Sequence, residues 1–167
     1  RLDNAAKIYP AAKRRGWTNY FRLSATLTEP ADVQVLRAAL DVTVRRFPSI
    51  AVRLRRGAFW YYLEQIPKAP PIEEDKSYPL VHVPFDDVRK CAFRVLVYHE
   101  RIAVEFFHAV TDGTGGTIFL KTLVAEYLCQ KHGIAIPATD GVLGRLEDPN
   151  EEELEDSFVR YAGDVHA

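Results

Sequence analysis

The 167-residue sequence contains no methionine, only two cysteines and no apolar run of membrane-spanning length. Because an initiating methionine is missing, we expect the chain to be part of a longer translated product. Cys91 and Cys129 form no CxxC pair, which excludes a disulfide framework and a cysteine-rich zinc site. Residues 1–15 lack the long apolar core of a signal peptide, so we expect a cytoplasmic protein with no membrane partner.

An excess of either charge is also missing. Lysine and arginine number 22, aspartate and glutamate 23, and the net charge of -1 gives no reason to expect nucleic acid as a partner. Small arginine clusters at 45–46 and 53–56 are balanced by acidic stretches elsewhere, which predicts solvated surface. The chain, 47% hydrophobic and 27% charged, has the length of a single domain spanning residues 1–167. Within it, about 134–167 is predicted as loop or tail, with a short acidic helix or a tail over 151–161.

The spacing of apolar residues predicts two helices. Between residues 33 and 47 apolar positions recur at steps of three and four, Asp32 can cap the amino-terminal end, and Pro48 ends the helix. A second helix carries an apolar face over residues 119–128 and stops near Gly133.

Alternating apolar and polar residues predict strands between and around these helices. The predicted strands span residues 20–28, 49–56, 58–66, 92–98 and 101–107. The middle two and the last two form hairpins, and the proline-rich residues 68–85 are predicted as a loop or a ragged sheet edge. This order indicates an α+β fold, in which helices cover a mixed or antiparallel sheet.

His108 is the first residue after the last predicted strand, at the turn into the second helix. A residue at a strand end stands at the rim of the sheet, where a substrate can reach it. An imidazole with its unperturbed pKa near ~6.5 accepts a proton at neutral pH, so His108 is the candidate general base. Asp112 can orient the ring or pair with an arginine that holds the turn, and Gly113 allows a tight backbone path. A structural histidine is the competing interpretation, and it is the commoner role at strand ends.

Other site chemistries lack the residues that they need. No second histidine or cysteine has metal-ligand spacing and HEXXH does not occur, so no metal site is predicted. The GTGG run at 113–116 lacks the lysine of a phosphate-binding loop, GxSxG does not occur, and neither cysteine has a paired base. A base without a protein nucleophile suits direct transfer, in which the substrate's own hydroxyl, amine or thiol attacks.

The stretch FFHAVTDGTGG, residues 106–116, resembles the HxxxDG signature of the CoA-dependent acyltransferase superfamily. That group includes chloramphenicol acetyltransferase and the condensation domains of nonribosomal peptide synthetases. The stretches LDNAAKIYP, RLSATLTEP, RRFPSIAVRLRRGAFWYYLE and FLKTLVAEYL resemble its bacterial alcohol acetyltransferase-like branch, in order and over nearly the whole chain. The resemblance implies one lobe, the N-terminal one, of a chloramphenicol acetyltransferase-like two-lobe fold.

The resemblance also implies roles for individual residues. His108 corresponds to the general base that deprotonates the acceptor as it attacks a thioester carbonyl. Asp112 corresponds to a structural carboxylate paired with an arginine, and Gly113 to the residue that keeps the turn open. The position of that arginine falls at Ala51 in this chain, and we expect Arg53, on the same strand face, to replace it.

The complete protein is therefore expected to be a CoA-dependent O- or N-acyltransferase. Its co-substrates would be an acyl-CoA, not permanently bound, and a small alcohol or amine acceptor. The alternatives are a non-catalytic binding or regulatory module and a condensation-type domain acting on carrier-protein thioesters. Condensation domains carry a second histidine where this chain has Phe107, which argues against that branch.

The resemblance implies that a C-terminal lobe is missing from this chain. That lobe would supply much of the CoA-binding wall and part of the oxyanion stabilisation. We therefore expect the chain alone to fold but to be inactive. The apolar surface that should face the second lobe also makes self-association of the chain an expectation.

Overall fold

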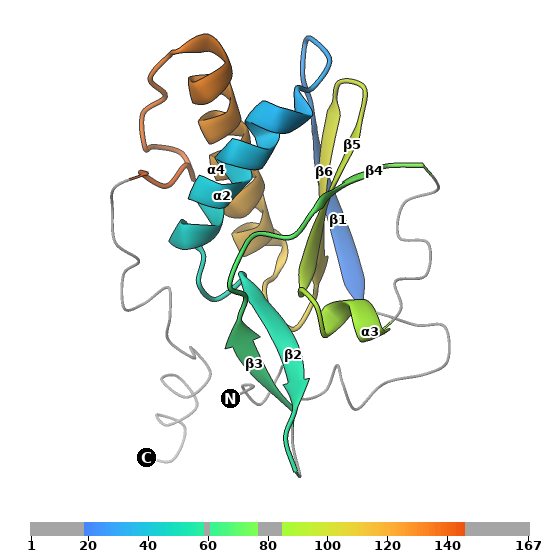
Figure 1. Cartoon of the computed structure of the whole chain (residues 1–167). Coiled ribbons are helices and arrows are strands. Elements are labelled where there is room, and N and C mark those ends of the chain that lie inside the picture. Colours follow the sequence, from blue (N-terminus) through green and yellow to red (C-terminus); the bar gives the residue numbers. More distant parts are fainter. Residues whose placement is uncertain (1–18, 59–60, 77–84, 146–167) are drawn as a thin grey trace, which may run out of the picture.

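The computed structural model describes residues 19–58, 61–76 and 85–145. Its elements are β1 (Tyr20–Thr26), α2 (Val33–Arg46), β2 (Val52–Arg56), β3 (Tyr61–Gln65), β4 (Ile72–Glu74), α3 (Phe85–Val88), β5 (Phe93–Tyr98), β6 (Arg101–Phe107) and α4 (Gly113–His132). The long helices α2 and α4 lie together on one side of the main sheet, and the β2–β3 hairpin extends beyond the sheet's end (Figure 1). None of the described helices combines the length and hydropathy that a membrane crossing requires.

The main sheet has four strands in the order β1-β6-β5-β4. β6 is antiparallel to both β1 and β5, whereas β4 runs parallel to β5. The hairpin of β2 and β3 forms a separate antiparallel pair. The mixed sheet with helices on one face confirms the predicted α+β class, and both predicted hairpins are present.

The sheet has one strand that the sequence pattern did not reveal. β4 lies inside residues 68–85, the segment predicted as a loop or a ragged edge, and pairs with β5 over three residues. Such a short parallel pairing leaves no alternating pattern, because its partner lies about twenty residues away in the sequence. After α4, residues 134–145 contain neither helix nor strand, as predicted, and the acidic stretch 151–161 lies outside the described residues.

Capping residues set the boundaries of both long helices. The Asp32 carboxylate accepts hydrogen bonds from the backbone N–H groups of Gln34 and Val35, at 3.0 and 3.2 Å. These bonds satisfy donors that have no partner within the helix. At the far end of α4, Gly133 adopts a left-handed conformation with φ 65° and donates its N–H to the Cys129 carbonyl. The predicted start of the first helix and end of the second are thereby confirmed.

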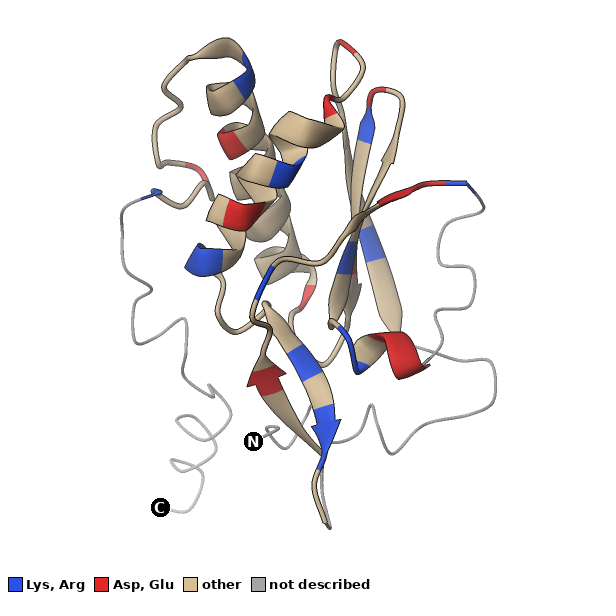
Figure 2. Ribbon diagram, in the orientation of Figure 1, with Lys and Arg blue, Asp and Glu red and all other residues tan. Residues whose placement is uncertain are grey.

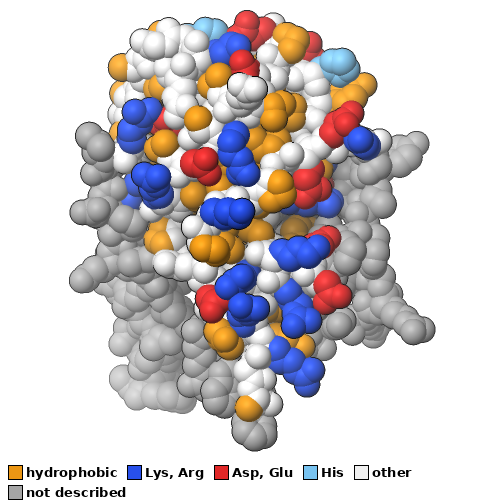
Figure 3. Space-filling view, in the orientation of Figure 1, with side chains coloured by type: hydrophobic (Ala, Val, Ile, Leu, Met, Phe, Trp, Pro, Cys, Tyr) orange, Lys and Arg blue, Asp and Glu red, His pale blue; other side chains and the backbone are white. Residues whose placement is uncertain are grey.

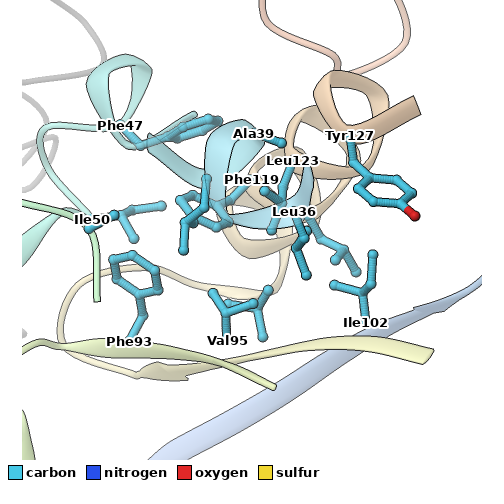
Figure 4. Close-up of a cluster of buried hydrophobic side chains, with 14 of the residues drawn as sticks. Leu36, Ala39, Phe47, Ile50, Phe93, Val95, Ile102, Phe119, Leu123 and Tyr127 are labelled. Carbon is cyan, nitrogen blue, oxygen red and sulfur yellow. The ribbon is translucent and has the colours of Figure 1, made fainter. Parts of the chain in front are cut away.

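The main core fills the space between the two helices and the sheet (Figure 4). Its large buried members include Leu36 and Leu40 from α2, Phe119, Leu123 and Tyr127 from α4, and Phe93, Val95, Ile102 and Phe106 from the sheet. The ring of Phe119 meets those of Phe93 and Phe106 edge to face, with centroids 5.1 and 5.4 Å apart. This aromatic cluster packs α4 against the centre of the sheet.

The opposite face of the sheet carries buried charges. Glu105, on the central strand, is directly opposite Arg22 of β1 and Arg94 of β5, and its side chain is 0% exposed. It accepts hydrogen bonds from Arg22 at 3.0 Å and Arg94 at 2.6 Å. Beside it, Asp75 binds Arg22 and Arg101, and the hydrogen bonds from Arg22 are the main cause that lowers the pKa of the Asp75 carboxyl. These ion pairs join three strands and the end of β4.

Large apolar side chains that are exposed lie on separate elements of the described chain. They are Val33, Tyr98 and Ile134. Scattered residues of this kind are normal on a soluble domain, so the expected uncovered apolar face has no support among the described residues. Self-association of the chain stays a prediction.

We expect Glu105→Gln to lower the free energy of unfolding by about 3–5 kcal/mol, because it removes the buried carboxylate charge that half-buried Arg22 and Arg94 share. Glu64→Gln is the matched control, since Glu64 also bridges two arginines but its side chain is 39% exposed. Urea denaturation of both variants measures the difference. A Glu105→Gln loss no larger than that of Glu64→Gln would show that the buried pairs contribute little to stability.

Candidate functional site

The end of β6 places His108 at the rim of the sheet. The preceding residue, Phe107, is buried in a second apolar cluster with Val52, Leu54, Val88 and Ala92. The His108 backbone N–H donates to the Asn19 carbonyl, at 2.7 Å, just before β1. The strand end is therefore held on both sides while the His108 side chain is exposed, as the sequence predicted.

An aromatic side chain supports the His108 ring. The rings of His108 and Phe21 are 4.8 Å apart between centroids and inclined by 53°. Phe21 in turn stacks on Phe106, at 5.4 Å and 29°. Because Phe106 is part of the core, the imidazole rests on a rigid surface that restricts its orientation.

Asp112 has a structural role in the turn, but a different one from that predicted. It is the N-cap of α4, and its Oδ1 accepts a hydrogen bond from the Gly115 N–H at 2.8 Å. Among the residues that the structure describes, Asp112 forms no ion pair with an arginine. Its carboxylate compensates for the unpaired N–H groups and the positive end of the helix dipole.

The expected arginine partner, Arg53, is bound elsewhere. In the β2–β3 register Arg53 is directly opposite Glu64, and its guanidinium bonds to that carboxylate at 2.6 Å. Arg55 donates to the same carboxylate at 3.0 Å, and the bonds from Arg55 and Arg53 lower the pKa of Glu64. The prediction that Arg53 holds Asp112 is therefore corrected: cross-strand pairing satisfies this arginine within its own hairpin.

A pocket of about 190 Å³ shows which arginine does lie near the turn. It is lined by Arg46, Phe47, Ser49, Ile50, Val110, Thr111, Gly115, Ile118 and Leu143. Phe47, Ser49 and Ile50 thus lie beside the turn, together with Arg46. Arg46 is only 4% exposed, which contradicts the solvated surface predicted for its cluster. Arg46 follows Ala39 and Thr43 at steps of four and three on one face of α2, and all three are buried. This spacing could have predicted the burial of Arg46.

The glycines of the turn have different surroundings. A Cβ at Gly113 would have no heavy atom within 4 Å, so no close contact in the described structure requires glycine there. A Cβ at Gly115 would lie 2.3 Å from Thr111 Oγ1, and one at Gly116 would lie 3.0–3.2 Å from Phe21, Leu23 and Phe106. The close approach that small residues at the start of the helix allow is therefore found at Gly115 and Gly116, whereas Gly113 has no such contact among the described residues.

The two cysteines offer no activated thiol. Cys91 and Cys129 are both half-buried and unlinked. Burial raises the pKa of Cys91 to about 11, so this thiol is protonated at neutral pH. No group of three or more His, Cys, Asp or Glu side chains in the described part of the chain has the arrangement of a metal site.

We expect Asp112→Ala to lower the free energy of unfolding by about 0.5–2 kcal/mol, the usual loss of an N-cap. Asp112→Ser, which can still accept the Gly115 N–H, should recover most of that loss. Urea denaturation measures both. A loss of more than about 3 kcal/mol for Asp112→Ala, without recovery in Asp112→Ser, would indicate a buried ion pair instead.

We expect iodoacetamide to alkylate Cys91 very slowly in the folded protein, since roughly one thiol in a thousand is ionised at pH 8 when the pKa is about 11. Peptide mass spectrometry over time measures the labelling of Cys91 in native protein and in urea. Equal rates in the two states would contradict the burial of this thiol.

No family model matches the chain, and no curated protein matches its sequence. Solved structures do match its fold. The X-domain from teicoplanin biosynthesis has a TM-score of 0.65 at 14% identity, and the match covers 97% of this chain and 38% of that one. The starter condensation domain of rhizomide synthetase RzmA has a TM-score of 0.65 at 13% identity, covering 84% and 40%. The chain has a condensation-domain-like fold.

A third match extends the likeness beyond synthetases. Polyketide synthase associated protein 5 from Mycobacterium tuberculosis has a TM-score of 0.58 at 16% identity, covering 83% of this chain and 35% of that one. The chain spans about a third to two fifths of the length of the structures it matches. The expectation of a single lobe of a larger two-lobe fold is therefore confirmed, at identities that show the fold alone.

Proposed function

We propose that this chain is the histidine-bearing lobe of an acyl-transferring enzyme in which His108 is the general base. The observation that carries the proposal is the exposed His108 at the end of β6, within the HxxxDG signature and on a condensation-domain-like fold. The rim position leaves the ring accessible, and Phe21 supports it from the core side.

His108 would act by proton transfer and not by covalent attack. Its neutral ring removes the proton from the acceptor hydroxyl or amine as the acceptor attacks the thioester carbonyl. The tetrahedral intermediate then collapses, the carbon–sulfur bond breaks, and the protonated ring returns the proton to the departing thiolate. Asp112 and Gly115 hold the turn on which the base stands.

The structural neighbours favour a carrier-protein thioester over acyl-CoA as the donor. They include the first condensation domain of the calcium-dependent antibiotic synthetase, solved with a substrate analogue, at a TM-score of 0.61 and 19% identity. Condensation domains carry a second histidine where this chain has Phe107, and this difference supports acyl-CoA as the donor instead. We therefore propose a thioester as the acyl donor. Of the two thioesters, we propose the carrier-protein thioester as the first candidate and acyl-CoA as the second.

We expect His108→Ala in the complete protein to lower kcat by at least about 100-fold, the usual loss for a general base. His132→Gln is the control, because His132 lies at the other end of α4, roughly 30 Å away at 1.5 Å per residue. Thiol release from an acyl-carrier protein and from an acyl-CoA, assayed in parallel, identifies the donor. Turnover of His108→Ala within a few-fold of the unchanged protein would exclude the catalytic role.

A partner-binding module is the second candidate function. Its support is the match over 97% of the chain to the teicoplanin X-domain, a domain that has also been solved in complex with OxyB. A complete protein with no turnover on either thioester, and with unchanged properties in His108→Ala, would favour this candidate over acyl transfer.

A further inference from the structure

Positive charge is concentrated in one part of this nearly neutral chain. Six of its 22 lysines and arginines lie between positions 45 and 68, against one of its 23 acidic residues, Glu64. The six are Arg45, Arg46, Arg53, Arg55, Arg56 and Lys68. Figure 2 marks lysine and arginine positions along the β2–β3 hairpin, and Figure 3 shows such side chains on the surface in the same region.

An open groove of about 510 Å³ lies between the end of α2 and the base of this hairpin. Its apolar lining consists of Val44, Pro48, Ala51, Ile66, Pro67 and Ala69. Arg45, Lys68, Gln65 and one carboxylate, Asp41, complete it. The groove therefore suits a segment that has apolar residues on one side and acidic residues beside them.

The groove continues into the arginines of the hairpin. Ala51, Arg53 and Arg55 alternate on one strand face, and the Ile66 N–H donates to the Ala51 carbonyl at 2.9 Å. Across that face, Arg53 and Arg55 share the single carboxylate of Glu64. Two guanidinium groups for one carboxylate leave a surplus of positive charge next to the apolar lining.

The last described residue of the chain, Arg145, lies on the other flank of α2. Arg145 lines a cavity together with Val42, Thr43 and Arg46 of that helix, while Asp41, Val44 and Arg45 face the groove. An α-helix with its side chains is about 10–12 Å across, so the groove begins about one helix diameter from Arg145. Six extended residues span up to about 20 Å, which is enough to cross α2.

The sequence that follows Arg145 is complementary to the groove in charge and in apolar spacing. Residues 147–156, EDPNEEELED, contain seven acidic residues and no basic one. Leu154, Phe158 and Tyr161 recur at steps of four and three, so a helical arrangement would align them on one side. These residues lie outside the described part of the chain. Their acidic and apolar side chains would complement the positive charge and the apolar lining of the groove.

We propose that the acidic segment 151–161 of this chain docks into the groove between α2 and the β2–β3 hairpin. Its apolar positions would cover Val44, Ile66 and Pro67, and its carboxylates would face Lys68 and the hairpin arginines. Because these charges are exposed, each ion pair contributes little and the docking is sensitive to salt.

Zero-length cross-linking with a water-soluble carbodiimide tests the proposal, because it joins an amine to a carboxylate only when the two are in contact. We expect an amide between Lys68 Nζ and one of the segment's carboxylates, identified by peptide mass spectrometry. Lys121 of α4, whose Nζ bonds to the Asp140 carbonyl 2.9 Å away, is the internal control and should not join the segment. The Lys68 product should decrease at about 1 M salt, where the Debye length is about 3 Å.

A mixture of isotope-labelled and unlabelled chains distinguishes the two possible sources of the segment. Cross-linked peptides of a single isotope composition support docking within one chain. Pairs of mixed composition would mean that the groove holds the segment of a second copy, and would overturn the proposal. So would the absence of any product between Lys68 and the segment.

A charge variant tests the role of the hairpin. Combined Arg53→Ser, Arg55→Ser and Arg56→Ser substitutions should lower the Lys68 product by at least about threefold, since several exposed pairs are lost together. Arg89→Ser, in the turn after α3, is the control, because it removes an exposed arginine away from the groove. An unchanged yield in the triple variant would overturn the proposal that the hairpin arginines face the carboxylates of the segment. Circular dichroism confirms that each variant is folded, and the cross-link in the unchanged protein tests the docking without any variant.

Discussion

The close contact between the first turn of α4 and the sheet determines where the candidate base stands. At Gly116 the helix backbone comes so near Phe21 and Phe106 that a Cβ would be 3.0 and 3.2 Å from their rings. Phe106 belongs to the strand that ends one residue before His108, and Phe21 supports the His108 ring. One packing contact therefore fixes the helix, the strand end and the imidazole together, and a larger residue at position 116 would displace all three.

This contact can be rigid because the central strand is held from both faces. On the helix side β6 is covered by the aromatic cluster around Phe119. On the other side Glu105 binds arginines from both neighbouring strands, so β1 and β5 are tied to β6 by charge as well as by backbone hydrogen bonds. A buried carboxylate is costly to desolvate, and two directly opposite guanidinium groups offset that cost only in the native register. The network thus favours the one alignment of β1 that brings Phe21 to His108.

Local patterns predicted the parts of the fold that depend on local physics. The apolar spacing and Asp32 cap of α2 and the two hairpins all follow from neighbouring residues. β4 was missed because its parallel partner is distant in sequence, and Arg46 was assigned to the surface although it shares a helix face with buried Ala39 and Thr43. At the site, the exposed position of His108 was predicted correctly. The pairing of Arg53 was not, although the hairpin register already placed Glu64 directly opposite it.

The pairing of Asp112 changes how the turn must be understood. A turn held by an ion pair to another segment would keep its shape even if the helix after it frayed. Here the Asp112 carboxylate binds the Gly115 N–H, so the turn is ordered only while the first turn of α4 is formed. That first turn is in turn ordered by its packing at Gly116. The orientation of the candidate base His108 is therefore coupled to the docking of one helix end on the sheet.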